Sequence, residues 1–297
     1  MGMPDVRTTA DEPRRGTFTN GMEYLAWGHG PRTLLSIQGG PGSFVPEGSM
    51  ARMMARLHRP YVDAGFAVWI VTRRRDMPAA HTVADMADDY AALIAAEFGG
   101  RVDLVVGESY GGIVAQYLAA RHPERLERVA LVIAGCEVSP WGKDVDSRLA
   151  TALARRDATG CGMAFGEYVL PGRRLRWLRR LAAPLIGRAL FAEEQCPPGD
   201  VLTELRAEVE FDSREVLPTI RIPVLLVSGG RDRFFPPAVI EETAALIPEC
   251  TVVRYAGKGH LGVGMDKRVA SDVLAFAGLQ EPSSDRRQAG RPRPSRR

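Results

Sequence analysis

The sequence of 297 residues lacks the features that define several large classes of protein. Its four cysteines form no CxxC or Cys/His pattern, so no structural zinc site is predicted and free thiols in a reducing compartment are expected. No run of about 18 apolar residues is present, so no membrane-spanning helix is expected. The first 16 residues are polar, without the apolar centre of a secretory signal. These absences together favour a cytoplasmic protein. The four cysteines are Cys136, Cys161, Cys196 and Cys250.

The chain also has little net charge, and that charge is unevenly placed. The formal charge is +3, but residues 280–297 carry six arginines against Glu281 and Asp285. The body of the protein is therefore close to neutral, and the basic character belongs to the tail. This distribution does not predict a nucleic-acid groove or a membrane surface. The charge distribution leaves the oligomeric state open.

What is present is an alternation of short apolar runs with helix-forming segments. Strands are predicted at 33–37, 66–72, 102–106, 128–134, 223–228 and 251–255, with helices between most of them. This order predicts an α/β fold with a mostly parallel sheet flanked by helices. Residues 137–217 have no clear strand and are expected to form a helical cap inserted between the core segments 17–136 and 218–279. Residues 1–16 are predicted to be a flexible N-terminus and residues 280–297 a disordered basic tail.

One stretch organises the rest: the apolar run from Val102 to Val106 ends in Gly107-Glu108-Ser109-Tyr110-Gly111, and a helix-forming segment follows. A strand, a sharp turn and a helix form the context in which Gly-x-Ser-x-Gly presents a nucleophilic serine. Gly107 and Gly111 are expected to leave room where a Cβ would collide with a neighbouring element. A glycine-rich turn can also carry a serine by chance, so the partners of Ser109 decide between the two interpretations.

Serine needs a base to remove its proton, and the base needs an acid that orients it. Asp232 and His260 each follow a predicted strand on a glycine-rich loop, at the edge where parallel sheets place their sites. The chain order Ser109, Asp232, His260 is typical of this architecture. Glu137, just after another strand, is an alternative acid. His29, His58, His81 and His122 lack this setting and are interpreted as structural.

At these residues the chain resembles the α/β-hydrolase superfamily. The resemblance covers residues 18–279 and is weakest in the cap. The loop Gln38-Gly39-Gly40-Pro41-Gly42 is similar to the His-Gly-Gly-Pro-Gly loop of proline-iminopeptidase-like serine hydrolases, although Gln38 replaces the histidine. The resemblance implies that Ser109, His260 and Asp232 form a catalytic triad. It also implies that the N–H groups of Gly40 and Tyr110 bind the oxyanion, without a metal or organic cofactor.

The reaction and the role of the cap stay open at this point. An esterase or small-molecule acyl hydrolase is the main hypothesis, and we expect a small-molecule or short-peptide substrate. A proline-iminopeptidase-like aminopeptidase would need acidic cap residues to hold a free amine, and an acyltransferase, lyase or cyclase can share the fold. Residues 173–180 form a basic patch, interpreted as a solvated helix face or a docking site for an anionic partner. The candidate amine-binding acids are Glu167, Glu193, Glu194, Glu204, Glu208 and Glu210. Cap aromatic residues that could line a pocket or form the cap's own core are Trp141, Phe165, Tyr168, Trp177 and Phe191.

Overall fold

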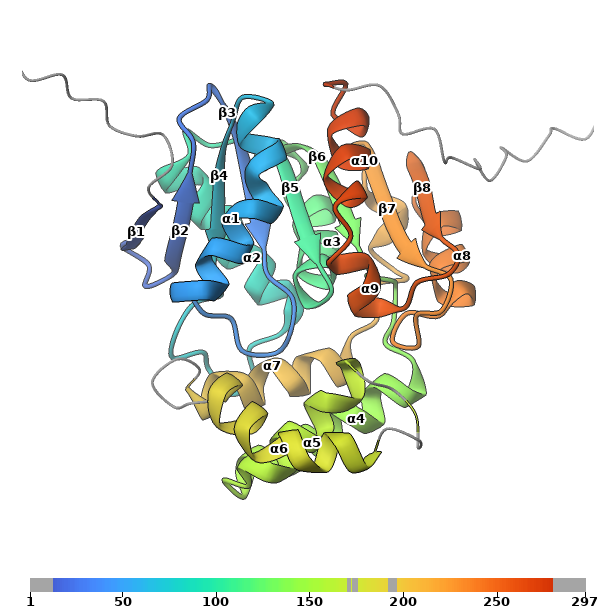
Figure 1. Ribbon diagram of the computed structural model, residues 1–297. Helices are drawn as coiled ribbons and strands as arrows, with labels where there is room; N and C mark the ends of the chain where they lie inside the picture. Colours follow the sequence, from blue (N-terminus) through green and yellow to red (C-terminus); the bar gives the residue numbers. More distant parts are fainter. Residues whose placement is uncertain (1–12, 170–171, 173–175, 192–196, 280–297) are drawn as a thin grey trace, which may run out of the picture.

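A central sheet of eight strands organises the computed structural model, which describes residues 13–169, 172, 176–191 and 197–279 (Figure 1). The strand order is β1-β2-β4-β3-β5-β6-β7-β8. Strands β3 to β8 pair in parallel, and β1 and β2 are antiparallel. The predicted α/β fold class is confirmed. The strands are β1 (Arg14–Thr17), β2 (Glu23–Trp27), β3 (Arg32–Ile37), β4 (Phe66–Val71), β5 (Val102–Glu108), β6 (Leu126–Val132), β7 (Val224–Gly229) and β8 (Cys250–Tyr255).

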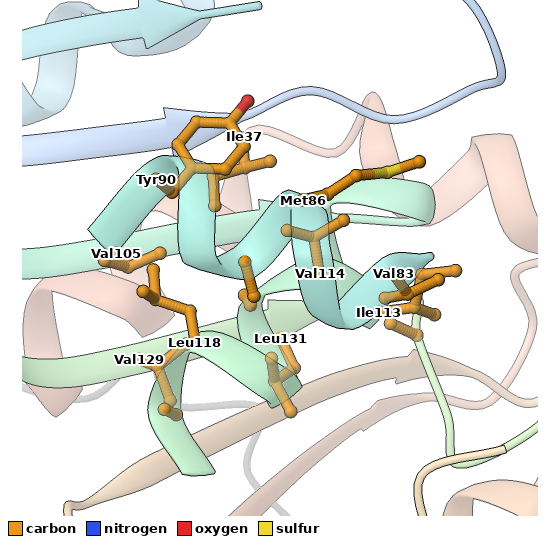
Figure 2. Packing of buried hydrophobic residues seen from close by; sticks show 14 of the residues in the cluster. Ile37, Val83, Met86, Tyr90, Val105, Ile113, Val114, Leu118, Val129 and Leu131 are labelled. Carbon is orange, nitrogen blue, oxygen red and sulfur yellow. The ribbon is translucent and has the colours of Figure 1, made fainter. Parts of the chain in front are cut away.

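Helices cover both faces of the sheet, and each face has its own apolar core. On one face, α2 (Val83–Glu97), α3 (Tyr110–Arg121) and α8 (Pro237–Leu246) pack on the strands. Figure 2 shows this packing, in which Val114 and Leu118 of α3 lie among strand residues such as Val105 and Leu131. On the other face lie α1 (Gly48–Asp63), α9 (His260–Gly264) and α10 (Arg268–Phe276). Because both faces are buried, the inner strands read as continuous apolar runs.

The chain enters the sheet earlier than the sequence indicated. A hairpin with a turn at Asn20-Gly21 joins β1 to β2, and β1 begins at Arg14, which pairs with Ala26. The prediction that residues up to 16 are loose is therefore wrong for residues 14–16. The guanidinium of Arg14 holds this strand by donating to the carbonyl of Gly28 and lying over the ring of Trp69. Such a short strand with alternating exposure has no apolar run that would predict it.

The segment between β6 and β7 leaves the sheet and forms helices below the carboxyl ends of the strands (Figure 1). An isolated bridge between Glu137 and Asp212 closes the base of this cap, and Arg214 joins it by ion pairs to Glu137, Asp212 and Glu242. The cap helices in the described residues are α4 (Pro140–Ala154), α5 (Ala158–Val169), α6 (Arg176–Leu190) and α7 (Pro198–Glu210). Two 3₁₀ helices, Pro123–Arg125 and Leu217–Thr219, precede β6 and β7 respectively.

Several predictions concern segments that the structure does not describe or describes only in part. Residues 1–12 and the predicted basic tail 280–297 lie outside the described residues, as does Cys196. Cys136, Cys161 and Cys250 are free thiols, as predicted. Within the described ranges, none of the helices combines the length and apolarity needed to cross a bilayer.

Candidate active site

Ser109 lies on a strained turn between the central strand β5 and helix α3. Its backbone angles are φ 53° and ψ −114°, a region that residues other than glycine rarely adopt. The turn is possible because its neighbours are glycines. A Cβ at Gly111 would lie 2.0 Å from the carbonyl oxygen of Ile37, and one at Gly107 would lie 2.5 Å from that of Gly111. The predicted reason for both glycines is confirmed.

The structure brings the three residues of the expected triad together. Ser109 Oγ lies 2.8 Å from Nε2 of His260, and Nδ1 of His260 lies 2.8 Å from Oδ2 of Asp232. These residues follow β5, β8 and β7, whose carboxyl ends meet at the edge of the sheet that faces the cap (Figure 1). An imidazole held between an acid and a hydroxyl can accept the hydroxyl proton while the acid orients the ring.

The carboxylate that contacts His260 is that of Asp232, and not that of the alternative acid Glu137. Asp232 is only 3% exposed, and its second oxygen, Oδ1, accepts the backbone N–H groups of Phe234 and Phe235 at 2.8 and 3.1 Å. Those two bonds fix the carboxylate, so that Oδ2 points at the imidazole. Glu137 instead pairs with Arg214 at the base of the cap, at 2.7 Å. Its carboxylate serves the attachment of the cap.

The loop after β3 lies directly beside the serine. A Cβ on Gly39 would be 3.1 Å from Cβ of Ser109, so only glycine lets the loop approach this closely. The next residue, Gly40, has a φ of 72°. Tyr110 is the first residue of α3, where backbone N–H groups have no helical acceptor. The loop and this helix start therefore hold the two N–H groups predicted to bind an oxyanion.

Comparison with known proteins identifies the family of the chain. The sequence model of the Alpha/beta hydrolase family matches residues 27–272. The chain belongs to the α/β hydrolase family. A pimeloyl-[acyl-carrier protein] methyl ester esterase of Neisseria meningitidis is 33% identical over 153 residues, 50% of this chain and 57% of that protein. The chain thus spans only about half the length of this curated relative.

Solved structures show the same fold over most of this α/β hydrolase. The enol-lactonase of Burkholderia xenovorans superimposes with a TM-score of 0.68 at 21% identity, covering 87% of this chain and 98% of that one. A thermophilic esterase of Thermogutta terrifontis gives a TM-score of 0.66 at 22% identity, covering 89% and 97%. At this level of identity the likeness shows the fold alone.

Two buried charged groups near the site were not predicted to act there. Arg73, directly beyond β4, is buried and forms an ion pair with Glu204 of α7. Asp146 of α4 is fully buried and accepts a hydrogen bond from the hydroxyl of Tyr168. A signal for Arg73 was available, because it follows a strand at the same sheet edge as the triad. The sequence around Asp146 contains no such signal, because its helical pattern does not indicate that this side chain faces the sheet.

Aromatic rings connect the cap to the imidazole of His260. Phe234 lies with its ring centroid 5.5 Å from that of His260 and 5.4 Å from that of Tyr168. Trp141 meets Phe234 at 6.2 Å. Of the cap aromatics that the sequence singled out, Tyr168 and Trp141 thus contact Phe234, whose ring lies beside the imidazole of His260. Phe165 contacts Tyr168 and Phe191 inside the cap.

Glu108, which precedes Ser109 in the chain, is partly buried. Burial raises the pKa of Glu108 from 4.5 to about 6, and the charge of His260 opposes that rise. The side chain also packs against α9, because a Cβ on Gly264 would lie 2.2 Å from Oε1 of Glu108. Glu108 therefore joins the nucleophile turn to the short helix that begins at His260.

The basic patch differs from its predicted form. Residues 173–175 lie outside the described residues, and within α6 Arg179 is only 5% exposed, faces Glu167 at 3.6 Å and donates to the carbonyl of Gly172. The interpretation of the whole patch as a solvated face is therefore wrong at Arg179. Arg176 and Arg180 are exposed, and the same helix also exposes Trp177, Leu181 and Leu185, at 63%, 72% and 75%.

Three of the other four histidines contact groups other than Ser109 and Asp232. His58 bonds the carbonyl of Met54 through Nδ1, His81 pairs with Asp89, and His122 pairs with Asp88. His29 is exposed. No group of three or more histidine, cysteine, aspartate or glutamate side chains is placed to hold a metal ion in the part of the chain that is described.

Proposed function

We propose that this α/β hydrolase cleaves an ester bond of a small molecule through an acyl-enzyme intermediate on Ser109. The observation that carries the proposal is the unbroken line of hydrogen bonds from Ser109 Oγ through His260 to Asp232. The family and the name of the Neisseria relative, a methyl ester esterase, support ester hydrolysis in particular. The substrate carries an acyl group that enters between the sheet edge and the cap.

In the first half of the reaction, Ser109 Oγ attacks the carbonyl carbon of the ester while its proton passes to Nε2 of His260. The N–H groups of Gly40 and Tyr110 stabilise the negative oxygen of the tetrahedral intermediate. When that intermediate collapses, the bond to the alcohol oxygen breaks and His260 returns the proton to it. The alcohol leaves and the acyl group stays on Ser109.

In the second half, a water molecule replaces the alcohol. His260 removes a proton from this water as its oxygen attacks the acyl carbon, and then gives the proton to Ser109 Oγ as the acid leaves. Asp232 orients the ring and stabilises the imidazolium that forms twice in each cycle. The backbone N–H groups of Phe234 and Phe235, which donate to Oδ1 of Asp232, keep this carboxylate in place.

The proposal is tested by covalent labelling together with a burst assay. A fluorophosphonate probe should label the wild-type protein, and p-nitrophenyl acetate should give a burst of p-nitrophenol; Ser109→Ala should lose both. Ser228→Ala is the matched control, since Ser228 is buried at the end of β7 and its hydroxyl has no hydrogen-bond partner among the described residues. Ser109→Ala with wild-type turnover would refute the proposal. Products formed with and without an added alcohol separate hydrolase from acyltransferase.

A second candidate, an aminopeptidase, is favoured by one observation in the cap. Asp146 and Glu208 are buried, and one carboxylate oxygen of each has no hydrogen-bond partner among the described residues. Burial raises the pKa of Asp146 to about 7, against the hydrogen bond from Tyr168 and the charge of His260. Burial and the charge of Asp146 also raise the pKa of Glu208. A protonated amine entering beside this acid pair would supply the missing partners.

The two candidates differ in the substrates they prefer. An aminopeptidase should cleave prolyl-p-nitroanilide faster than its N-acetylated form, and Glu208→Gln should remove that preference while leaving hydrolysis of p-nitrophenyl acetate in place. An esterase should cleave the acetate ester and neither anilide. Equal rates on the free and acetylated anilides would exclude an amine-binding role for the acid pair.

A further inference from the structure

A buried ion pair joins the cap to the loop beside Ser109. Arg73 Nε lies 2.7 Å from Oε1 of Glu204, and the guanidinium makes a second bond to Oε2 at 2.9 Å. The two side chains are 1% and 2% exposed. Arg73 stands at the end of β4 in the core, whereas Glu204 lies on the cap helix α7. Burial lowers the pKa of Arg73, but the charge and hydrogen bonds of Glu204 outweigh burial and raise it, so the guanidinium stays charged.

The same guanidinium holds the loop that carries the first proposed oxyanion donor. Arg73 donates to the carbonyl oxygens of Gln38 and Gly40, each at 2.9 Å. These oxygens belong to the peptide groups on either side of the peptide that contains the N–H of Gly40. Because Arg73 holds the peptide groups before and after it, the direction of the Gly40 N–H is also fixed. Glu204 adds a third contact by accepting the N–H of Gly42.

The pair also touches the residue that carries the second proposed donor. The guanidinium carbon of Arg73 lies 4.4 Å from the ring centre of Tyr110, and the hydroxyl of Tyr110 donates to the backbone carbonyl of Glu204 at 3.0 Å. Arg73 and Glu204 therefore contact both residues proposed to donate to the oxyanion, the loop residue Gly40 and the helix residue Tyr110. Half of the ion pair comes from the cap.

We propose that Arg73 and Glu204 are positioning residues for the oxyanion hole, through which the seating of α7 controls how well the site stabilises the transition state. The inference rests on the proposed serine-hydrolase function. A buried ion pair is by itself weak evidence for stability, because desolvation offsets much of the attraction. What these two residues provide is instead the orientation of the Gly40 N–H, together with contacts to the side chain of Tyr110.

The experiment compares variants of the Arg73–Glu204 pair with a variant of another contact between the cap and the core. Glu204→Gln keeps the shape of the side chain and weakens the hold on Arg73, and Arg73→Lys keeps the charge but cannot reach both carbonyls as a fork. Asp200→Asn is the control. Asp200 lies one turn earlier on α7 and also ties the cap to the core, by accepting the N–H groups of Asp76 and Met77 at 3.2 and 2.8 Å. It does not bond the loop from Gln38 to Gly42.

Turnover of p-nitrophenyl acetate and inhibition by a trifluoromethyl ketone are measured for each variant. The ketone forms a tetrahedral adduct with the serine and so reports the oxyanion hole. We expect kcat to fall about 100-fold in Glu204→Gln and Arg73→Lys, the loss typical of one misplaced oxyanion donor. KM should stay within about threefold, because that donor acts mainly on the transition state, and the inhibition constant should rise in parallel. Asp200→Asn should change kcat by less than about threefold, because its hydrogen bonds go to Asp76 and Met77 and not to the loop beside Ser109.

A further variant separates positioning from folding. Replacing a buried ion pair with apolar residues of similar volume is often neutral or stabilising, so Arg73→Met with Glu204→Leu should fold. Without the guanidinium it should still lose about 100-fold in kcat. Wild-type kcat in this folded double variant, or an equal loss in Asp200→Asn, would overturn the inference. Undiminished turnover in Ser109→Ala would instead overturn the function on which the inference rests.

Discussion

Replacing Asp232 by asparagine changes one atom of the triad and tests the role of the acid. Oδ1 of Asp232 accepts two backbone N–H groups, from Phe234 and Phe235, and Oδ2 faces Nδ1 of His260 at 2.8 Å. In Asp232→Asn the amide oxygen keeps the two N–H bonds, so the NH₂ group must take the place of Oδ2. That group only donates, so Nδ1 becomes the acceptor and the ring proton moves to Nε2.

A protonated Nε2 cannot remove the proton of Ser109, from whose Oγ it lies 2.8 Å away. We expect kcat for p-nitrophenyl acetate to fall about 10⁴-fold, as is typical of this substitution in Ser-His-Asp triads. That loss corresponds to about 5.4 kcal/mol of activation free energy. Because the backbone bonds of the loop survive, the free energy of unfolding should change by less than about 1 kcal/mol.

Steady-state kinetics and urea unfolding of the same preparations check both numbers. Glu137→Gln is the control, because Glu137 was the alternative acid and lies in the partly exposed ion pair with Arg214. It should keep wild-type kcat and lose at most about 1 kcal/mol of stability. If Asp232→Asn retains more than about a tenth of wild-type kcat, the tautomer argument fails. A comparable loss in Glu137→Gln would show that the acid is misassigned.

Two further substitutions test the packing and titration of the nucleophile turn. Gly111→Ala places a Cβ 2.0 Å from the carbonyl of Ile37 and should cost about 3 kcal/mol of unfolding free energy, whereas Gly199→Ala, with open space around it, should be neutral or stabilising in the same urea titration. Glu108→Gln should become more stable than wild type as the pH rises. The pKa of Glu108 is raised from 4.5 to about 6, so its contribution to stability is complete below pH 4.5 and is lost as the pH rises through 6. Between pH 4.5 and 7.5 the difference from Glu108→Gln should grow by about 2 kcal/mol, and a constant difference would contradict the raised pKa.

Much of the site could be predicted because the sheet is parallel. Ser109, Asp232 and His260 each follow an apolar run, and parallel strands bring such positions to one edge whatever their separation along the chain. The glycines around Ser109 indicated a crowded turn, and the structure shows the crowding at Gly107 and Gly111. Strand periodicity and turn chemistry are local properties, so they can be read from a few neighbouring residues.

Contacts with the cap could not be predicted in this way. Arg73 and Glu204 are 131 residues apart, and neither has a local pattern that points to the other. The glutamates were candidates for binding an amine, yet Glu204 turns to Arg73, and Asp146 was not considered. The burial of Arg179 and the exposure of Trp177 on α6 reverse what composition indicates. Helix packing inside the cap, not hydrophobicity, decides which face of α6 is covered.

The sequence by itself therefore determined the fold class, the nucleophile turn and the sheet edge where the triad residues lie. The tertiary structure alone decided that Asp232 rather than Glu137 faces His260, and that a cap carboxylate is tied to the loop beside Ser109. The physical reason is the distance along the chain over which each kind of interaction acts. Backbone geometry and apolar periodicity act between near neighbours, whereas the pairing of buried charges depends on how whole helices pack on the sheet.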